Sequence, residues 1–304
     1  MNKIFAIVAF LWSVAVFSQN QYQGQLLEKA FENKSIEYLH DFFENWHNKI
    51  LPVSDSDLNE MNNIHLQTYN VFAAFYKPTK IDSLGGSEWG NDIYKPSKYL
   101  IVQNSIEIYL TDKVVYNEQE KEQYTIDNVN KIIKNKKKRE SFLRREDGKL
   151  LASTIYEFGP EGTIARSYEA NNELIDSIED FRPLIKCENK KVLYLTQDYE
   201  VLLNAFLGHE SIPLGTEGIM NPAKSKNDSE ERKLFLENFI KIWYGHWGGY
   251  WQLITYPLAY SITFDKNMEY ARIDFRVVYE GGEAILKNNE GKWSLISSKK
   301  TWIE

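Results

Sequence analysis

The chain has few of the features that would assign a function directly. Its 304 residues include a single cysteine, Cys187, so no disulfide can form within the chain and cysteine-rich metal sites are excluded. A net charge of −7 argues against a nucleic-acid partner, since such proteins are usually basic. No phosphate-binding loop, dinucleotide fingerprint or G-x-S-x-G nucleophile motif is present. These absences favour a non-enzyme that needs no cofactor. They leave open carboxylate-based hydrolysis, which has little local signature.

The chain begins with an apolar run, Ile4 to Phe17, that follows Lys3 and precedes a polar stretch. Small residues at Val16 and Ser18 indicate a signal peptide, residues 1–18, cleaved between Ser18 and Gln19. The run is too short to span a bilayer comfortably, although a retained N-terminal anchor stays open. We expect an exported protein, periplasmic or extracellular, with no transmembrane segment after cleavage. Export without disulfides is common among bacterial envelope proteins.

Residues 19–207 predict an N-terminal α+β region. Apolar spacing indicates a helix over 36–50 with Ser35 as its N-cap, and a second helix from Asp57 to just before Pro78. Strands are expected at 99–110 and 191–196, a hairpin around 159–162, and a helix at 197–207 that Gly208 ends. Residues 208–227 gather glycine and proline and predict a linker or long loop.

Residues 228–304 predict a C-terminal α+β unit, which begins near residue 185 if the helix at 197–207 belongs to it. A helix should start at Asp228, with Glu231 in the capping position, and run through Trp243 to end near Gly245. Four alternating strands follow, with Gly281 and Gly282 as the connection between the second and third. The fold class is therefore α+β: helices packed on curved antiparallel sheets, ending in a helix and a four-stranded meander.

Residues 271–302, "ARIDFRVVYEGGEAILKNNEGKWSLISSKKTW", form a strand–hairpin–strand pattern in which G-x-W starts the last strand. This pattern resembles the C-terminal half of the cone-shaped domains of the nuclear-transport-factor-like superfamily. The resemblance implies a curved sheet that wraps helices and leaves a pocket. It implies little about activity, because members of that superfamily include enzymes, binding modules and inert partners.

The stretch "WYGHWGGYW", residues 243–251, supplies the candidate site. Three glycines should end the helix and spread the aromatic rings over a turn, with Trp243 in the core. Flat rings on such a turn suit a sugar face or an apolar small molecule. The candidate ligand-binding residues are Tyr244, His246, Trp247, Tyr250 and Trp251. Alternatively, these rings plug the wide end of the sheet.

We therefore predict a binding protein that takes a small molecule, a glycan or a protein partner through an aromatic-lined pocket. The alternative is a hydrolase acting on envelope or extracellular polymers through a carboxylate pair.

Three other clusters have simpler explanations. His40, Glu44 and His47 share one helix side but lack the H-E-x-x-H order, so we predict boundary residues and no metal. The lysine-rich segment 131–145 either docks another envelope component or forms a solvated face. Arg272, Asp274 and Arg276 lie on the polar side of their strand, where we expect cross-strand ion pairs on an exposed face.

Overall fold

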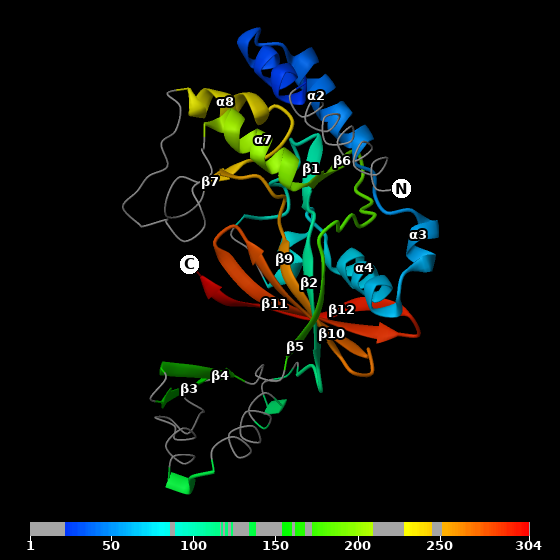
Figure 1. The fold of residues 1–304 in the computed structure, drawn as a ribbon, viewed down its shortest axis with the longest axis vertical. Helices are drawn as coiled ribbons and strands as arrows, with labels where there is room; N and C mark the ends of the chain where they lie inside the picture. Colours follow the sequence, from blue (N-terminus) through cyan, green and yellow to red (C-terminus); the bar gives the residue numbers. More distant parts are fainter. Residues whose placement is uncertain are drawn as a thin grey trace, which may run out of the picture.

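A computed structural model shows an α+β protein whose helices and sheets are stacked along one long axis (Figure 1). The structure describes residues 22–85, 89–115, 117, 119–120, 123, 134–137, 154–159, 162–167, 172–208, 228–244 and 251–303. The predicted signal peptide, nearly all of the predicted linker and most of the lysine-rich segment lie outside these ranges. Within them, no helix combines the length and apolar character that a bilayer span requires.

Side-chain caps determine where the N-terminal helices begin. Residues 22–32 are helical, and α2 (Ile36–Lys49) starts where the Ser35 hydroxyl accepts a hydrogen bond from the Tyr38 amide, as predicted. The predicted second helix is wrong in its extent, because it is two helices, α3 (Asp55–Glu60) and α4 (Asn63–Phe75). Its first cap is Ser54, and Asn62 caps the His65 amide to begin α4. A short 3-10 helix, η1 (Ile81–Leu84), follows.

The main sheet confirms the predicted C-terminal meander and extends it. Its strand order is β12-β11-β10-β9-β2-β5. The meander consists of β9 (Leu258–Asp265), β10 (Tyr270–Val277), β11 (Glu280–Asn289) and β12 (Lys292–Ile303), all antiparallel. Two further strands precede the predicted linker in the sequence. Of these, β2 (Ile106–Thr111) pairs with β9 in parallel, and β5 (Glu173–Ile178) pairs with β2. Segments on both sides of residues 208–227 thus share one sheet.

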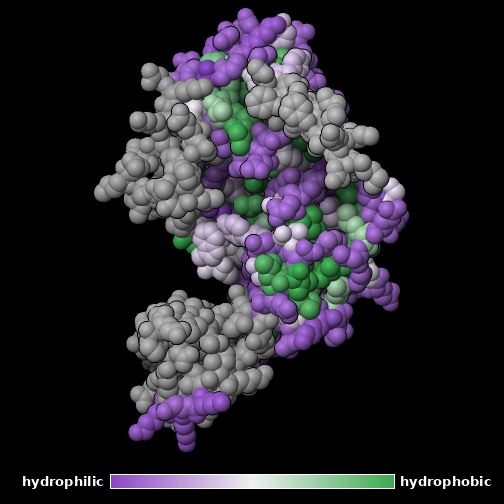
Figure 2. Space-filling model, viewed as in Figure 1, coloured by the Kyte–Doolittle hydropathy of each residue, from purple (hydrophilic) through white to green (hydrophobic). Residues whose placement is uncertain are grey.

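The edge strand β5 is exposed along almost its whole length. Leu174 is 55% and Ile175 38% exposed, and Figure 2 shows hydrophobic side chains gathered on the face where β5 lies. Glu173 and Asp176 interrupt this apolar surface. Charged residues on an edge strand oppose pairing with another chain.

The glycine pair does not form the turn that the sequence predicted. In the register of β10 and β11, Val277 faces Glu280, so Val278 and Tyr279 make the connection and both glycines lie inside β11. A side chain at Gly281 would overlap the indole of Trp302, and one at Gly282 would meet the Phe275 ring. Trp302 and the Lys299 carbonyl belong to β12 and Phe275 to β10, so these glycines serve close packing between neighbouring strands rather than a turn conformation.

A parallel ribbon of β1 (Tyr99–Gln103) and β6 (Lys191–Leu195) separates two hydrophobic cores. Side chains on one side, Leu100, Val102, Val192 and Tyr194, join the core between α4 and the main sheet, which we call the lower core. Those on the other side, Tyr99, Ile101, Leu193 and Leu195, join the core of α2, α7 (Gln197–Leu207) and α8 (Ser229–Leu236), the upper core. A ribbon buried on both sides explains its almost continuous apolar sequence.

The C-terminal helix is shorter than predicted. It ends at Leu236 instead of near Gly245, and Trp243–Tyr244 form a strand, β7, paired with β8 (Trp251–Gln252). The carboxylate of Glu237 accepts hydrogen bonds from the Lys233 and Lys241 ammonium groups, and the carbonyl of Phe239 accepts from the amides of residues 98 and 99. These contacts hold residues 237–240 in a turn that still buries Phe239 and Ile240, so the apolar periodicity did not require a helix.

Candidate functional site

Trp243, the first ring of the aromatic stretch, is a core residue, as predicted. It is 7% exposed, and its Nε1 donates a hydrogen bond of 3.2 Å to the Tyr94 hydroxyl. The same hydroxyl accepts from the Tyr256 amide at 2.8 Å. The Trp89 ring packs edge-on against Trp243 at a centroid distance of 4.8 Å. Trp243 therefore anchors the lower core to the loop that contains residues 89–94.

Trp251 belongs to the upper core and is 9% exposed. The Lys233 ammonium lies 5.3 Å from its ring centroid. Tyr244 faces Trp251 in the register of β7 and β8, whereas His246, Trp247 and Tyr250 lie outside the described residues. Trp243 and Trp251 thus bury their rings in different cores, and a binding role for the five candidates stays a prediction.

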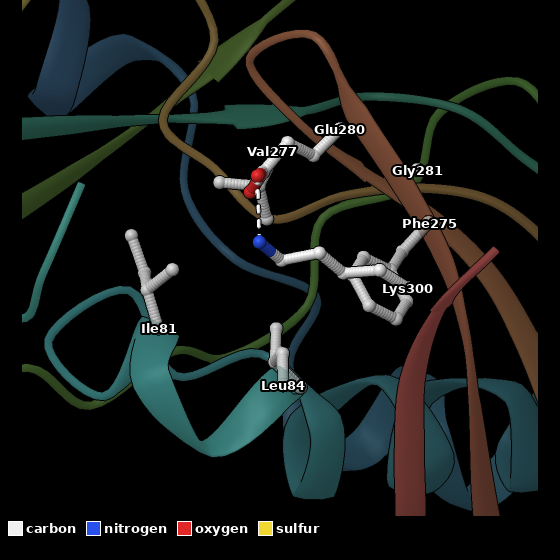
Figure 3. A pocket seen from close by; sticks show the side chains of 7 residues that line it. All are labelled: Ile81, Leu84, Phe275, Val277, Glu280, Gly281 and Lys300. Atoms are coloured by element: carbon white, nitrogen blue, oxygen red, sulfur yellow. Dashed lines mark hydrogen bonds and ion pairs between the residues drawn. The ribbon is translucent and has the colours of Figure 1, made fainter. Parts of the chain in front are cut away.

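A pocket opens where the β10–β11 turn and the end of β12 meet η1 (Figure 3). Its empty volume is about 210 Å³, part of it open to solvent. The lining residues are Ile81, Leu84, Phe275, Val277, Glu280, Gly281 and Lys300. The walls are therefore apolar except for one acid and one base, which is the composition typical of small-molecule sites.

The acid and the base of this pocket form an ion pair. Nζ of Lys300 lies 2.6 Å from Oε1 of Glu280, and the two groups point toward each other between the apolar walls (Figure 3). The Glu280 side chain is 6% exposed and that of Lys300 30%. Oε2 of Glu280 is buried and has no hydrogen-bond partner within the described residues. One carboxylate oxygen thus lacks a donor among those residues, and a water-sized group can touch it only if a neighbouring side chain moves.

Aromatic contacts connect Trp243, of the predicted aromatic stretch, to a residue next to this pocket. The Trp89 ring lies 4.8 Å from that of Trp243 and 5.7 Å from that of Tyr279, the residue directly before Glu280. Sequence reasoning missed Ile81, Leu84, Glu280 and Lys300. A signal for Glu280 was present, because the period of a strand places it on the same side as Ala284 and Leu286, both buried in the lower core. A charged residue on an apolar strand face is unusual unless it is paired.

The opposite face of the sheet carries a second set of charged groups. Asp274 lies on this polar side, as predicted, but the face is not as exposed as expected: Arg272 is 6% and Glu283 5% exposed. Arg272 pairs with Asp274 on its own strand at 3.2 Å, and Lys299 of β12 pairs across strands with Glu283 of β11 at 3.5 Å. Asp274 and Glu283 face each other in register, which sets their Cβ atoms about 5 Å apart.

On the side of α2 that carries the histidines, Glu44 and His47 form hydrogen bonds to β1 and β6. Glu44 accepts hydrogen bonds from the Tyr99 hydroxyl at 2.5 Å and from the Lys191 ammonium at 2.6 Å. Burial raises the pKa of Glu44, but these two hydrogen bonds outweigh it and hold the pKa below its ordinary value. His47 donates through Nδ1 to the Val192 carbonyl at 2.9 Å. In the part of the chain that the structure describes, no three His, Cys, Asp or Glu side chains are grouped to hold a metal ion.

Comparisons with protein-family models, with curated proteins and with solved structures find no match to this chain. Function must therefore be inferred from the side chains that line the pocket.

Proposed function

We propose that this chain is an exported, non-catalytic binding protein whose ligand enters the pocket at the end of the β9–β12 sheet. The apolar walls and the single acid–base pair support a site in which burial supplies affinity and two polar groups orient the ligand. Much of the pocket's empty volume is open to solvent, and its enclosed part has room for about one water molecule, so it suits a small polar group that forms one end of a ligand.

The observation that carries the proposal is the buried carboxylate of Glu280 beside Lys300. Taking the Glu280 carboxylate out of water costs several kcal/mol, and apolar side chains of similar volume often give equal stability in place of an ion pair. The ion pair should therefore contribute little to stability among the apolar side chains of Ile81, Leu84, Phe275 and Val277. It is a good device for recognition, because polar groups among apolar walls select ligands by their hydrogen bonds.

Aromatic residues contribute to this proposal in two ways. The indole of Trp302 lies against Gly281, which lines the pocket, so a bound ligand should change tryptophan emission. Tyr244, His246, Trp247 and Tyr250 are predicted to contact the part of a longer ligand that extends beyond the pocket, whereas the predicted site residue Trp251 buries its ring in the upper core. Trp247→Ala and Tyr250→Ala should then weaken binding of oligosaccharides more than binding of small alcohols and amides.

The test is a ligand titration of the chain beginning at Gln19, followed by tryptophan emission and by calorimetry. The panel would contain small alcohols, amides, acids, amines and oligosaccharides. The double variant Glu280→Leu/Lys300→Met replaces the ion pair with apolar groups of similar size, which should preserve folding. We expect it to lower affinity roughly tenfold or more, which corresponds to the loss of one buried hydrogen bond to a charged group.

The matched control is Lys34→Met/Glu231→Leu, which removes an ion pair of 3.7 Å whose side chains are 62% and 71% exposed. This control should bind as the original chain does. A panel in which no compound changes emission or releases heat would contradict the proposal. Equal affinity of the pocket variant and the original chain would contradict it too.

A second candidate, hydrolysis of envelope or extracellular polymers, is favoured by the facing carboxylates Asp274 and Glu283. Each of them has a cation beside it, whereas a glycosidase needs one of its two carboxyl groups to hold a proton. Asp274→Asn and Glu283→Gln would each abolish the release of reducing sugar from a glycan if this candidate were correct. Activity that survives both substitutions, or that never appears, would dismiss it.

Export is a separate part of the proposal, supported by the sequence of residues 1–18. Expression in a bacterium with cell fractionation, followed by N-terminal sequencing, should recover a periplasmic or secreted chain that starts at Gln19. Recovery of a membrane-bound chain that retains residues 1–18 would contradict it.

A further inference from the structure

We infer that the pocket recognises a small, largely apolar molecule through a neutral hydrogen-bond donor, a hydroxyl or an amide N–H, which Oε2 of Glu280 accepts. This inference rests on the proposed function and names the class of ligand for the same site. It follows from the different hydrogen-bond partners of the two oxygens of the Glu280 carboxylate.

The two oxygens of Glu280 have different surroundings. Oε1 lies 2.6 Å from the Lys300 ammonium. Oε2 is buried and is without a hydrogen-bond partner in the described ranges. An ionised carboxylate is an acceptor only, and each oxygen has two lone pairs. A group that occupies the pocket beside Oε2 must therefore bring a donor, since an acceptor placed there would leave both groups unsatisfied.

Charge selects among the possible donors. An anion attracted to Lys300 would lie against the carboxylate that already neutralises that ammonium, and like charges repel strongly away from water. An ammonium ligand would face the opposite problem beside the Lys300 ammonium. A neutral donor meets neither repulsion. The pair thus favours alcohols and amides over carboxylates and amines.

The walls determine the rest of the ligand. Ile81 and Leu84 of η1 and Phe275 and Val277 of β10 offer only carbon atoms to a bound molecule. The stem of Lys300 runs across the pocket (Figure 3) and is its most flexible wall. Because this side chain is 30% exposed, its stem can shift while its ammonium keeps the contact with Oε1, so that a compact apolar body lies over the open side of the pocket. A benzyl or short branched alkyl group fits this description.

The test uses four ligands with one body: benzyl alcohol, benzaldehyde, benzoate and benzylamine. Titrations of the full chain from Gln19 would follow the backbone amide resonances of Glu280 and Gly281 by NMR. We expect benzyl alcohol to bind about tenfold more tightly than benzaldehyde, which has nearly the same shape and no donor. Benzoate and benzylamine should also bind more weakly than the alcohol.

The decisive variant is Glu280→Gln, which keeps size and shape. Lys300 needs an acceptor, so the amide oxygen should face it and the amide NH₂ should take the place of Oε2. The preference should then reverse, with benzaldehyde binding more tightly than benzyl alcohol. Glu290→Gln, in the exposed turn between β11 and β12, is the control and should leave the order unchanged. Thermal melting would verify that both variants are folded.

The outcomes separate this inference from the proposed function. Benzoate as the tightest ligand, with binding lost in Glu280→Leu/Lys300→Met, would overturn the inference and keep the pocket as a binding site. The same order of affinities in Glu280→Gln as in the original chain would overturn it as well. Failure of all four ligands and of the wider panel to bind would overturn both.

Discussion

The indole of Trp302 lies against the backbone of Gly281, its partner in the register of β11 and β12. The space that a side chain at Gly281 would need is filled by this ring. Trp302 is 40% exposed, so the glycine allows a large ring to rest on the surface of the sheet. The same glycine lines the pocket, which connects the C-terminal end of the chain to the proposed site.

Gly281→Ala should destabilise the protein by about 1–3 kcal/mol, because the added methyl group forces the indole out of its position. Trp302→Ala removes the obstacle, so the double variant should be more stable than the sum of the two single effects predicts. Urea denaturation of the four chains measures this coupling. Gly24→Ala is the control: it lies in a helix with open space around it and should be neutral or stabilising. Additive effects of the two substitutions would refute the contact.

Tyr94→Phe should cost roughly 2–4 kcal/mol. The Tyr94 side chain is fully buried, and its hydroxyl accepts hydrogen bonds from both Trp243 Nε1 and the Tyr256 amide. The phenylalanine leaves two buried donors without an acceptor, and each unsatisfied donor costs about 1–3 kcal/mol. The midpoint of urea unfolding gives the value. Tyr260→Phe, on a side chain that is 43% exposed, should change the midpoint little. A loss as small as that of Tyr260→Phe would mean that water replaces the hydroxyl.

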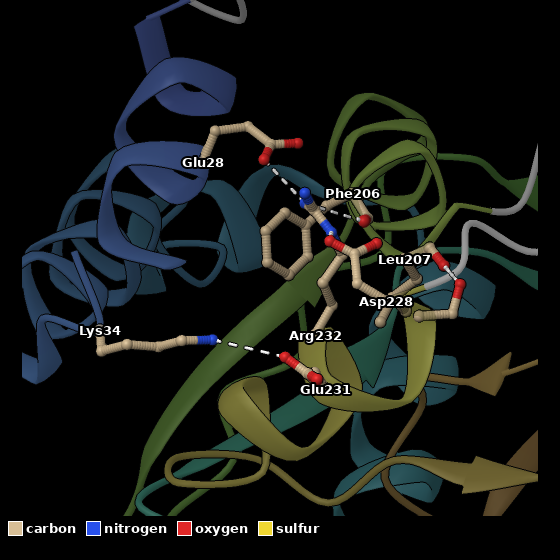
Figure 4. A network of polar contacts seen from close by, with 8 residues as sticks. Glu28, Lys34, Phe206, Leu207, Asp228, Glu231 and Arg232 are labelled. Carbon is tan, nitrogen blue, oxygen red and sulfur yellow. Dashed lines mark hydrogen bonds and ion pairs between the residues drawn. The ribbon is translucent and has the colours of Figure 1, made fainter. Parts of the chain in front are cut away.

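Arg232 should be the most sensitive polar residue of the upper core. Its guanidinium bonds to Glu28 at 2.7 Å and to Asp228 at 2.9 Å (Figure 4), and it lies 4.5 Å from the ring centroid of Phe31 and 4.8 Å from that of Phe206. Arg232→Met keeps some packing but leaves two carboxylates without their cation, and should cost about 2–4 kcal/mol. Arg232→Lys should recover only part of this loss, because a lysine cannot replace the planar, forked donor.

Urea denaturation measures both Arg232 variants, and Lys34→Met, from the exposed neighbouring ion pair, is the control. A lysine variant as stable as the original chain would show that charge alone accounts for the contribution of Arg232.

Glu237 should make the turn after α8 sensitive to acid. Burial raises the pKa of Glu237, but hydrogen bonds from Lys241 and Lys233 outweigh it and leave the pKa below its ordinary value. A carboxylate whose pKa is lower in the folded state contributes stability at pH values above its unfolded pKa of about 4.3. This contribution is lost as the pH falls through the pKa of the folded state.

Glu237→Gln should therefore be less stable than the original chain at pH 7, by about 1–2 kcal/mol, and equally stable near pH 3. Denaturation at a series of pH values gives the difference curve. Glu290→Gln, in an exposed turn, should show no such curve. A constant difference at all pH values would indicate a packing effect instead of titration.

Local sequence signals predicted those parts of the fold that depend on neighbours three or four residues away. Ser35 begins α2 and Gly208 ends α7 through hydrogen bonds within one helical turn. Alternation predicted the meander of β9 to β12, because one side of each strand must face the core. The position of Asp274 on the polar side followed from the same period.

Tertiary contacts decided the rest. The sequence predicted a turn at Gly281 and Gly282, but both lie within a strand, where the rings of Trp302 and Phe275 fill the space beside them. The helix α8 ends at Leu236 because distant amides at residues 98 and 99 bind the carbonyl of Phe239 and local carboxylate contacts hold the turn. Glu280 meets Lys300 only because bulges in the pairing of β11 and β12 shift which side chains share a face.

The sequence by itself thus determined the α+β class, the caps at Ser35 and Gly208 and the order of the C-terminal strands, since these follow from spacing along the chain. Only the tertiary structure decided that β2 and β5 complete the sheet, that Trp243 and Trp251 enter different cores, and that a pocket forms around Glu280. The physical reason is that burial and ion pairing act between groups that the folded chain brings together from distant positions, and spacing along the sequence carries no record of those distances.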